Sequence, residues 1–142
     1  LSTIHTNSAV GIITRLLDLG IPEYLISGTL TLAIAQRLVK RLCPDCKRPL
    51  PIDSDNTSPV YKKINLNKVH EPTGCPKCHY TGFKGRIAIF DLVSVDNDLV
   101  AELVNNNNEK KNVKVSDMEK KALSLVENGI TSASEVYQLI EF

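Results

Sequence analysis

CPDC at residues 43–46 and CPKC at residues 75–78 are the two stretches that decide how this chain can fold. They contain all four cysteines of the 142-residue sequence, and 28 residues separate them. The two-residue gap inside each pair lets both sulfurs reach one metal ion from a tight turn, and the proline in each gap favours that turn. Two such pairs can supply four thiolates to one tetrahedral site.

A structural zinc site is the arrangement that this spacing favours, with the ligands Cys43, Cys46, Cys75 and Cys78. Four cysteine ligands leave no open position for water, so such a site is structural and not catalytic. Two alternatives stay open: a pair of disulfides, and a redox-active CxxC motif that acts as a regulatory thiol switch. We expect His70 and His79 to be surface residues beside the metal site and not ligands.

Strands and helices are predicted on both sides of the cysteine pairs. A strand is expected at 86–95, and helices at 8–19, 22–27, 96–104, 116–128 and 132–140. The pattern of residues 30–42 fits either a helix or a turn followed by a strand at 33–41, and the strand is favoured because it would lead into the first cysteine pair and form a hairpin with the strand after the second pair. Each strand lies next to one cysteine pair, so a metal would tie the strand ends together and hold the proline-rich residues between them. Ser116 with Glu119, and Ser132 with Glu135, predict capping boxes on the last two helices.

The composition limits the class of protein. The chain has 17 Lys and Arg residues against 16 Asp and Glu residues, a net charge of +1 that gives no overall attraction to nucleic acid or to an anionic membrane. No apolar run approaches the roughly 18 residues that a membrane-spanning helix needs. The alternative, a free-standing zinc ribbon that binds nucleic acid, would use the basic residues Lys62, Lys63, Lys68, Lys77, Lys84 and Arg86. Because the net charge is only +1, we expect no nucleic-acid partner.

The N-terminal stretch LSTIHTNSA, residues 1–9, places polar side chains where a helix begins. Taken alone, Thr6, Asn7 and Ser8 are typical of a helix cap, and His5 is incidental. The chain has no initiator methionine, and we expect it to be a fragment of a longer polypeptide.

Five stretches, taken in order, resemble one family: LSTIHTNSA, RLLDLGI, AQRLVKRLCPDC, GCPKCHYTGFKGRIAIFDL and LVENGITSASEV. They are similar to the C-terminal part of the type II secretion and type IV pilus assembly ATPases, over nearly the whole chain. The resemblance implies a hexameric, cytoplasmic motor ATPase, peripheral at the bacterial inner membrane. It would drive pseudopilin or pilin assembly through inner-membrane platform or assembly proteins.

The resemblance also implies a fold class, α/β overall and α+β within this chain. It would be the C-terminal remnant of a RecA-like ATPase domain, with a four-cysteine zinc module inserted in a β-hairpin and a C-terminal helical hairpin. The segments would be 1–42 (RecA-like), 43–85 (zinc module), 86–104 (returning strand and helix), 105–115 (polar linker) and 116–142 (helical hairpin). If these are independent modules, loss of the metal should loosen 43–85 and leave the helices at 116–140 intact.

Individual residues take roles from the same resemblance. His5 falls on the family's histidine box, which is implicated in sensing the nucleotide phosphates, and the four cysteines fall on its zinc ligands. Arg37 and Arg86 match basic positions without an assigned role, and Asp91 stands where the family more often has Glu. The sequence contains neither GxxxxGK[ST] nor a Walker B element. We therefore expect ATP and Mg²⁺ to bind only to the full-length protein, and this chain alone to have no ATPase activity.

Overall fold

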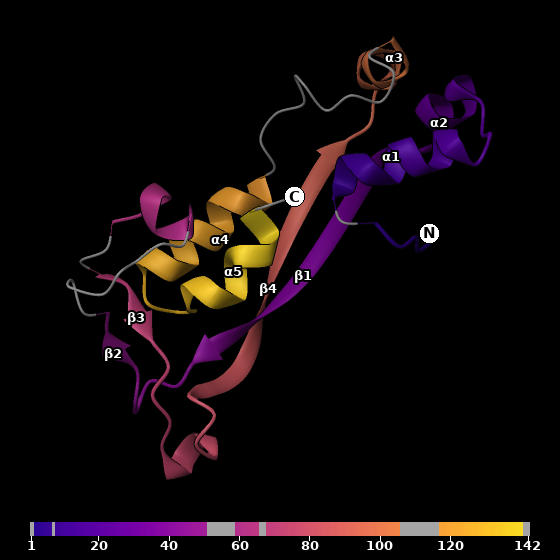
Figure 1. Cartoon of the computed structure of the whole chain (residues 1–142). Coiled ribbons are helices and arrows are strands. Elements are labelled where there is room, and N and C mark those ends of the chain that lie inside the picture. Colours follow the sequence, from indigo (N-terminus) through magenta and orange to yellow (C-terminus); the bar gives the residue numbers. More distant parts are fainter. Residues whose placement is uncertain (1, 7, 51–58, 66–67, 106–116, 141–142) are drawn as a thin grey trace. The chain divides into compact units, whose positions relative to one another are not determined.

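The structure, a computed structural model, describes residues 2–6, 8–50, 59–65, 68–105 and 117–140 (Figure 1). Its elements, in chain order, are α1 (Ala9–Asp18), α2 (Glu23–Thr29), β1 (Leu32–Leu42), β2 (Arg48–Pro49), the 3-10 helix η1 (Pro59–Lys63), β3 (His70–Glu71), the 3-10 helix η3 (Pro76–Cys78), β4 (Phe83–Ser94), α3 (Asn97–Asn105), α4 (Asp117–Glu127) and α5 (Ala133–Ile140). This mixture of helix and strand confirms the expected mixed class. The RecA-like origin stays a prediction. Most of the expected linker at 105–115, and the cap at Ser116, lie outside the described residues.

The long strands β1 and β4 form a two-stranded sheet, and their arrows point in opposite directions in Figure 1. Both strands were predicted, although β4 begins at Phe83, three residues before the expected start. From Leu32 to Val39 the buried side chains of β1 alternate with more exposed ones, as expected for a strand with one covered face. A second, short sheet pairs β2 with β3 antiparallel, with Arg48 opposite Glu71 and Pro49 opposite His70.

Contacts divide the chain into two compact units. The first unit contains residues 1–36 and 90–117, and the second contains residues 37–89 and 118–142. The five segments expected from the sequence stay a prediction, because a compact unit does not show which segments fold alone.

The first unit contains the predicted N-terminal helix and its cap. The Ser8 hydroxyl accepts a hydrogen bond from the Gly11 N–H at 3.1 Å, and Ile13 is fully buried on the inner face of α1. Helix α2 packs against α1 and α3. The Asp96 carboxylate caps α3 by accepting the Leu99 N–H at 2.8 Å, as predicted. Helix capping was therefore readable from the sequence in this unit.

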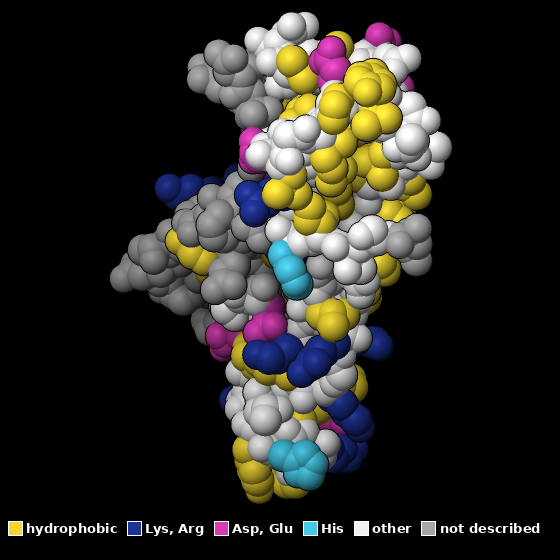
Figure 2. Space-filling view, turned by 90° about the vertical axis from the view of Figure 1, so that its right-hand side faces the viewer, with side chains coloured by type: hydrophobic (Ala, Val, Ile, Leu, Met, Phe, Trp, Pro, Cys, Tyr) yellow, Lys and Arg dark blue, Asp and Glu magenta, His cyan; other side chains and the backbone are white. Residues whose placement is uncertain are grey.

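The first unit also exposes many large apolar side chains. They are Leu19, Tyr24, Leu25, Leu32, Ile34, Phe90, Leu92 and Val104. Figure 2 shows hydrophobic side chains lying next to one another at the surface. Exposed apolar surface of this extent is typical of a contact area with another polypeptide or domain.

In the second unit, α5 is attached to β1 by hydrogen bonds that replace a predicted capping box. The predicted box at Ser132 and Glu135 is wrong, because both Glu135 carboxylate oxygens bind Lys40. One oxygen accepts the backbone N–H of Lys40 at 3.1 Å, and the other accepts its Nζ at 3.0 Å. The Thr131 hydroxyl donates to the Lys40 carbonyl at 2.8 Å. The carboxylate thus binds a strand N–H and a lysine ammonium together, and the Ser132 hydroxyl pairs with that of Ser134 instead.

The proline-rich part of the second unit is held by the C-terminal helices. Val60 in η1 is fully buried, and η1 packs against α5. Lys63 Nζ lies 2.6 Å from the Glu119 carboxylate, and the Asn65 N–H donates to Glu127 at 3.2 Å. The sequence predicted only a metal as support for this stretch, whereas the structure also supplies a packed core.

No helix in the described part of the chain combines the length and the apolar character that crossing a bilayer requires.

Replacing Glu135 with Ala should lower the free energy of unfolding of the second unit by about 1–2 kcal/mol, because the Lys40 N–H loses its acceptor. Urea denaturation of the metal-loaded chain would measure the change. Glu135→Gln is the matched control, since its amide oxygen can still accept that N–H, and it should cost less. Equal losses in the two variants would show that the ion pair, and not the backbone hydrogen bond, attaches α5.

Candidate metal centre

The first cysteine pair follows directly on β1. The Cys43 N–H donates to the Gly82 carbonyl at 2.9 Å, which joins the end of β1 to the residue before β4. The N–H groups of Cys46 and Lys47 then donate to the Cys43 carbonyl at 3.3 and 3.0 Å, which closes a tight turn. This turn gives both sulfurs of the pair a common direction, as the CxxC spacing predicts.

The second pair lies on a 3-10 turn, η3. The Cys78 N–H and the Tyr80 N–H both donate to the Cys75 carbonyl, at 3.1 and 2.9 Å. His79 and Tyr80 have φ values of 52° and 60°, in the left-handed region that non-glycine residues seldom occupy. The chain turns back sharply there, so that Gly82 reaches the first pair.

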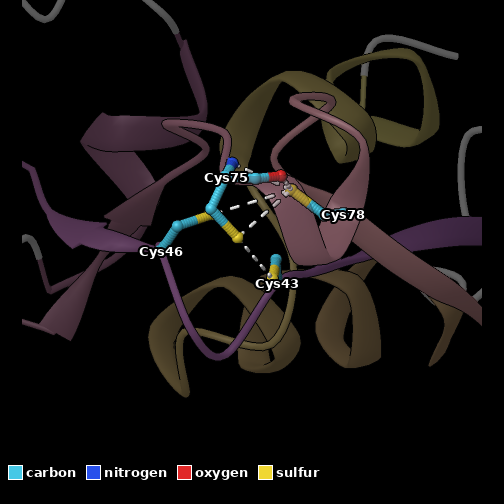
Figure 3. A group of neighbouring side chains, drawn as sticks. All are labelled: Cys43, Cys46, Cys75 and Cys78. Atoms are coloured by element: carbon cyan, nitrogen blue, oxygen red, sulfur yellow. Dashed lines mark hydrogen bonds between the residues drawn. The ribbon is translucent and has the colours of Figure 1, made fainter.

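The four sulfur atoms converge (Figure 3), and all of them lie within 4.8 Å of one another. The Cys43–Cys75 sulfur distance is 3.9 Å, and the Cys46–Cys78 and Cys75–Cys78 distances are both 3.8 Å. A tetrahedral zinc ion with Zn–S bonds of about 2.3 Å requires sulfur–sulfur distances of about 3.8 Å. All four cysteines are free, so the structure contains none of the disulfides that the sequence left open. Three of the six sulfur–sulfur distances therefore already match those of a tetrahedral site, and all four sulfurs are close enough to bind one metal ion.

Backbone N–H groups are directed at one of these sulfurs. The Cys75 and Gly82 N–H groups each donate to Cys78 Sγ at 3.3 Å. Burial raises the pKa of Cys78, but these two hydrogen bonds, together with hydrogen bonds from the Cys75 and Cys46 thiols, outweigh it and lower the pKa to about 6. Burial, reinforced by the neighbouring thiols, raises the pKa of Cys46 to about 12. Cys78 is therefore set up as a thiolate, the form in which cysteine binds a metal.

The basic residues near the site are partly engaged elsewhere. Lys77 pairs with Asp45 at 2.6 Å, and this hydrogen bond lowers the pKa of the Asp45 carboxyl group. Lys47 Nζ donates to the Gly129 carbonyl at 2.8 Å, in the turn between α4 and α5. The His70 ring also lies against Gly129, because a side chain on that glycine would come within 2.5 Å of His70 Nδ1. Lys47, next to Cys46, therefore links the four-cysteine group to the turn between α4 and α5, and His70 packs against the same turn.

The structure thus brings together the four cysteines that the sequence singled out. His70 and His79 are not part of this group among the described residues. His5 lies exposed in the first unit, ahead of α1, and its role stays a prediction, as do those of Arg37 and Arg86.

The sequence did not predict that Gly82 hydrogen-bonds both cysteine pairs, although a Thr-Gly pair at 81–82 follows the second cysteine pair. The Gly82 N–H binds Cys78 Sγ, its carbonyl binds the Cys43 N–H, and its φ is +77°.

Comparison with known proteins adds a relationship over most of the chain. The family model described as type II/IV secretion system protein matches residues 1–138. The type II secretion system ATPase E of Vibrio cholerae is 40% identical over 98% of this chain and 29% of its own length. The type IV pilus assembly ATPase TfpB of Acinetobacter baylyi is 35% identical over 99% of this chain and 26% of its own length. The putative type II secretion system protein E of Escherichia coli is 39% identical over 92% of this chain. The chain therefore spans less than a third of the length of these relatives.

Removing the metal, or replacing Cys43 with Ser, should loosen residues 118–140 together with residues 43–85. The links from Lys47 and His70 to Gly129 connect the two regions, so the contacts favour this outcome over the modular one expected from the sequence. Hydrogen exchange of the chain with and without a zinc chelator would measure it. Unchanged protection in α4 and α5 would contradict the coupling.

Replacing Gly82 with Ala should lower metal affinity by about 10- to 100-fold, as expected for a group that hydrogen-bonds a ligand. The new Cβ would lie 2.4 Å from the Pro72 Cβ, and the backbone has a positive φ. Gly85→Ala is the control, because Gly85 also has a φ of +77° but open space around it. The control should cost about 1–2 kcal/mol of stability from backbone strain and leave affinity nearly unchanged. Competition with a chromogenic zinc chelator would compare the two variants.

Proposed function

Because the chain belongs to the family of type II/IV secretion system proteins, we propose that it is the C-terminal portion of a motor ATPase that drives pseudopilin or pilin assembly. The observation that carries this proposal is the match of the family model to residues 1–138. In the longer protein the chain would supply a structural module and part of the nucleotide site. The Walker elements that bind and hydrolyse ATP with Mg²⁺ would come from the remainder of the polypeptide.

The four cysteines would hold a structural zinc ion. Three sulfur–sulfur distances of 3.8–3.9 Å fit a tetrahedral zinc, all four sulfurs lie within 4.8 Å of one another, and all four positions of the metal would be filled by thiolates. Such a site binds no water or substrate, so the metal would act on the fold alone. By fixing the second unit it would present a rigid surface to a partner of the assembly machine at the inner membrane.

The exposed apolar residues of the first unit support its burial in a larger assembly. Leu32 and Ile34 on β1, and Phe90 and Leu92 on β4, are large and exposed within the first unit. We place this surface against the rest of the longer ATPase, whose subunits would form a hexamer in the cytoplasm. The exposed side chain of His5 would then face the nucleotide phosphates.

A nucleic-acid-binding module remains the second candidate, because the charge of the chain is unevenly divided. The second unit has thirteen Lys and Arg residues against eight Asp and Glu residues, a net charge of +5, which the overall +1 hides. Figure 2 shows Lys and Arg side chains close together on one face. Salt-dependent binding of the zinc-loaded chain to single- or double-stranded DNA or RNA would favour this candidate.

Replacing His5 with Ala in the longer protein should lower the kcat of ATP hydrolysis at least tenfold, because His5 would lose its contact with the phosphates, and leave thermal unfolding unchanged. A coupled ATPase assay would measure it. His79→Ala is the matched control, since His79 is an exposed histidine beside the metal centre and should have no effect on kcat. An unchanged kcat in the His5 variant would contradict the proposed nucleotide contact, and absence of ATPase activity in the wild-type protein would contradict the motor function.

A further inference from the structure

Asp91, in β4, is a buried carboxylate in the first unit. Its side chain is 4% exposed, and it is the only charged side chain among the described residues that is buried. A buried carboxylate is strongly unfavourable unless it is hydrogen-bonded. The hydrogen-bond donor to the Asp91 carboxylate therefore indicates the role of this residue.

The partner of Asp91 is the start of α1. Asp91 Oδ2 accepts the backbone N–H of Ala9 at 3.0 Å, across 82 positions of sequence. Ala9 is the first residue of α1, and the first N–H groups of a helix have no acceptor within it. The positive end of the helix dipole also favours a carboxylate at this place. Asp91 thus fastens the first turn of α1 to β4.

The residues just before α1 lie against this fastened turn. The Thr6 hydroxyl donates to the Ser8 carbonyl at 3.1 Å. A Cβ on Gly11 would lie 3.6 Å from the Thr6 Cβ, an ordinary van der Waals contact, and 3.1 Å from the Ser8 Oγ, so Thr6 and Ser8 both lie next to the first turn. His5 directly precedes Thr6 and is exposed. The position from which His5 projects therefore depends on where the first turn is held.

We infer that Asp91 is a positioning residue for His5. By accepting the Ala9 N–H, it fixes the start of α1 on β4 and, through Thr6 and Ser8, the place from which the His5 side chain reaches the nucleotide. This inference rests on the proposed function of His5. Asp91 touches no substrate and acts only through the backbone of α1.

The hydrogen bond is tested in the zinc-loaded 142-residue chain by amide exchange at Ala9. In Asp91→Ala the Ala9 amide should exchange at least tenfold faster, while the Val100 amide, bonded to the Asp96 carbonyl in the same unit, keeps its rate. Asp96→Ala is the matched control, because it also removes an aspartate from a helix start, and it should leave Ala9 unchanged. An unchanged Ala9 rate in Asp91→Ala would overturn the inference.

The functional role is tested by a double-mutant cycle on kcat in the longer ATPase. Asp91→Ala should lower kcat at least tenfold when His5 is present and produce no further loss when His5 is Ala, because the two residues act as one unit. An equal loss in both backgrounds would show a general structural role and overturn the positioning role. Asp96→Ala should keep the wild-type kcat.

Two further variants keep the test decisive. Asp91→Asn retains an oxygen that can accept the Ala9 N–H, so it should lose less activity than Asp91→Ala and replaces it if that variant does not fold. Asp91→Glu moves the carboxylate by one methylene, and an intermediate kcat is expected. If His5→Ala leaves kcat unchanged, the function proposed for His5 is wrong, and the positioning role falls with it even where exchange at Ala9 confirms the hydrogen bond.

Discussion

The convergence of four sulfur atoms at the join between β1 and β4 is the constraint on which the second unit depends. A two-stranded sheet alone is marginally stable in water, and here it carries a long excursion between its strands. The Cys43 N–H donates to the Gly82 carbonyl, which aligns the strand ends, and the thiols then face one another at the spacing of a tetrahedral metal site. A metal ion bound by the four thiolates would stabilise this fold, because the free energy of metal binding adds to the free energy of folding.

The excursion between the cysteine pairs does not depend on the metal alone. Val60 and Val69 are fully buried in the second unit, although the sequence around them is polar and rich in proline. Helix α5 packs against η1, and Glu119 and Glu127 of α4 form the polar contacts with Lys63 and Asn65. Chain segments that are distant in sequence therefore stabilise one another, and residues 37–89 and 118–142 belong to the same compact unit.

The sequence predicted what depends on local spacing and missed what depends on distant partners. The CxxC turns and the cap at Ser8 follow from patterns of a few residues, whereas the strand at 33–41 was favoured over a helix because it leads into Cys43, and the structure contains all of them. Glu135 was read as part of a capping box because its spacing from Ser132 fits one, but Lys40 lies 95 positions away and binds the carboxylate instead. The family resemblance indicated His5 only because it combined motifs over nearly the whole chain.

The attachment of α5 also blocks the edge of β1 that does not pair with β4. The strand has β4 as its neighbour on one side, and on the other its Lys40 N–H, Lys40 carbonyl and Leu42 N–H are taken by Glu135, Thr131 and Ile130. Strand edges with free N–H and carbonyl groups invite pairing with other chains, which leads to aggregation. Two side chains and the turn between α4 and α5 occupy the hydrogen-bonding positions of a third strand, so another polypeptide could add to this part of the sheet only after α5 had been displaced.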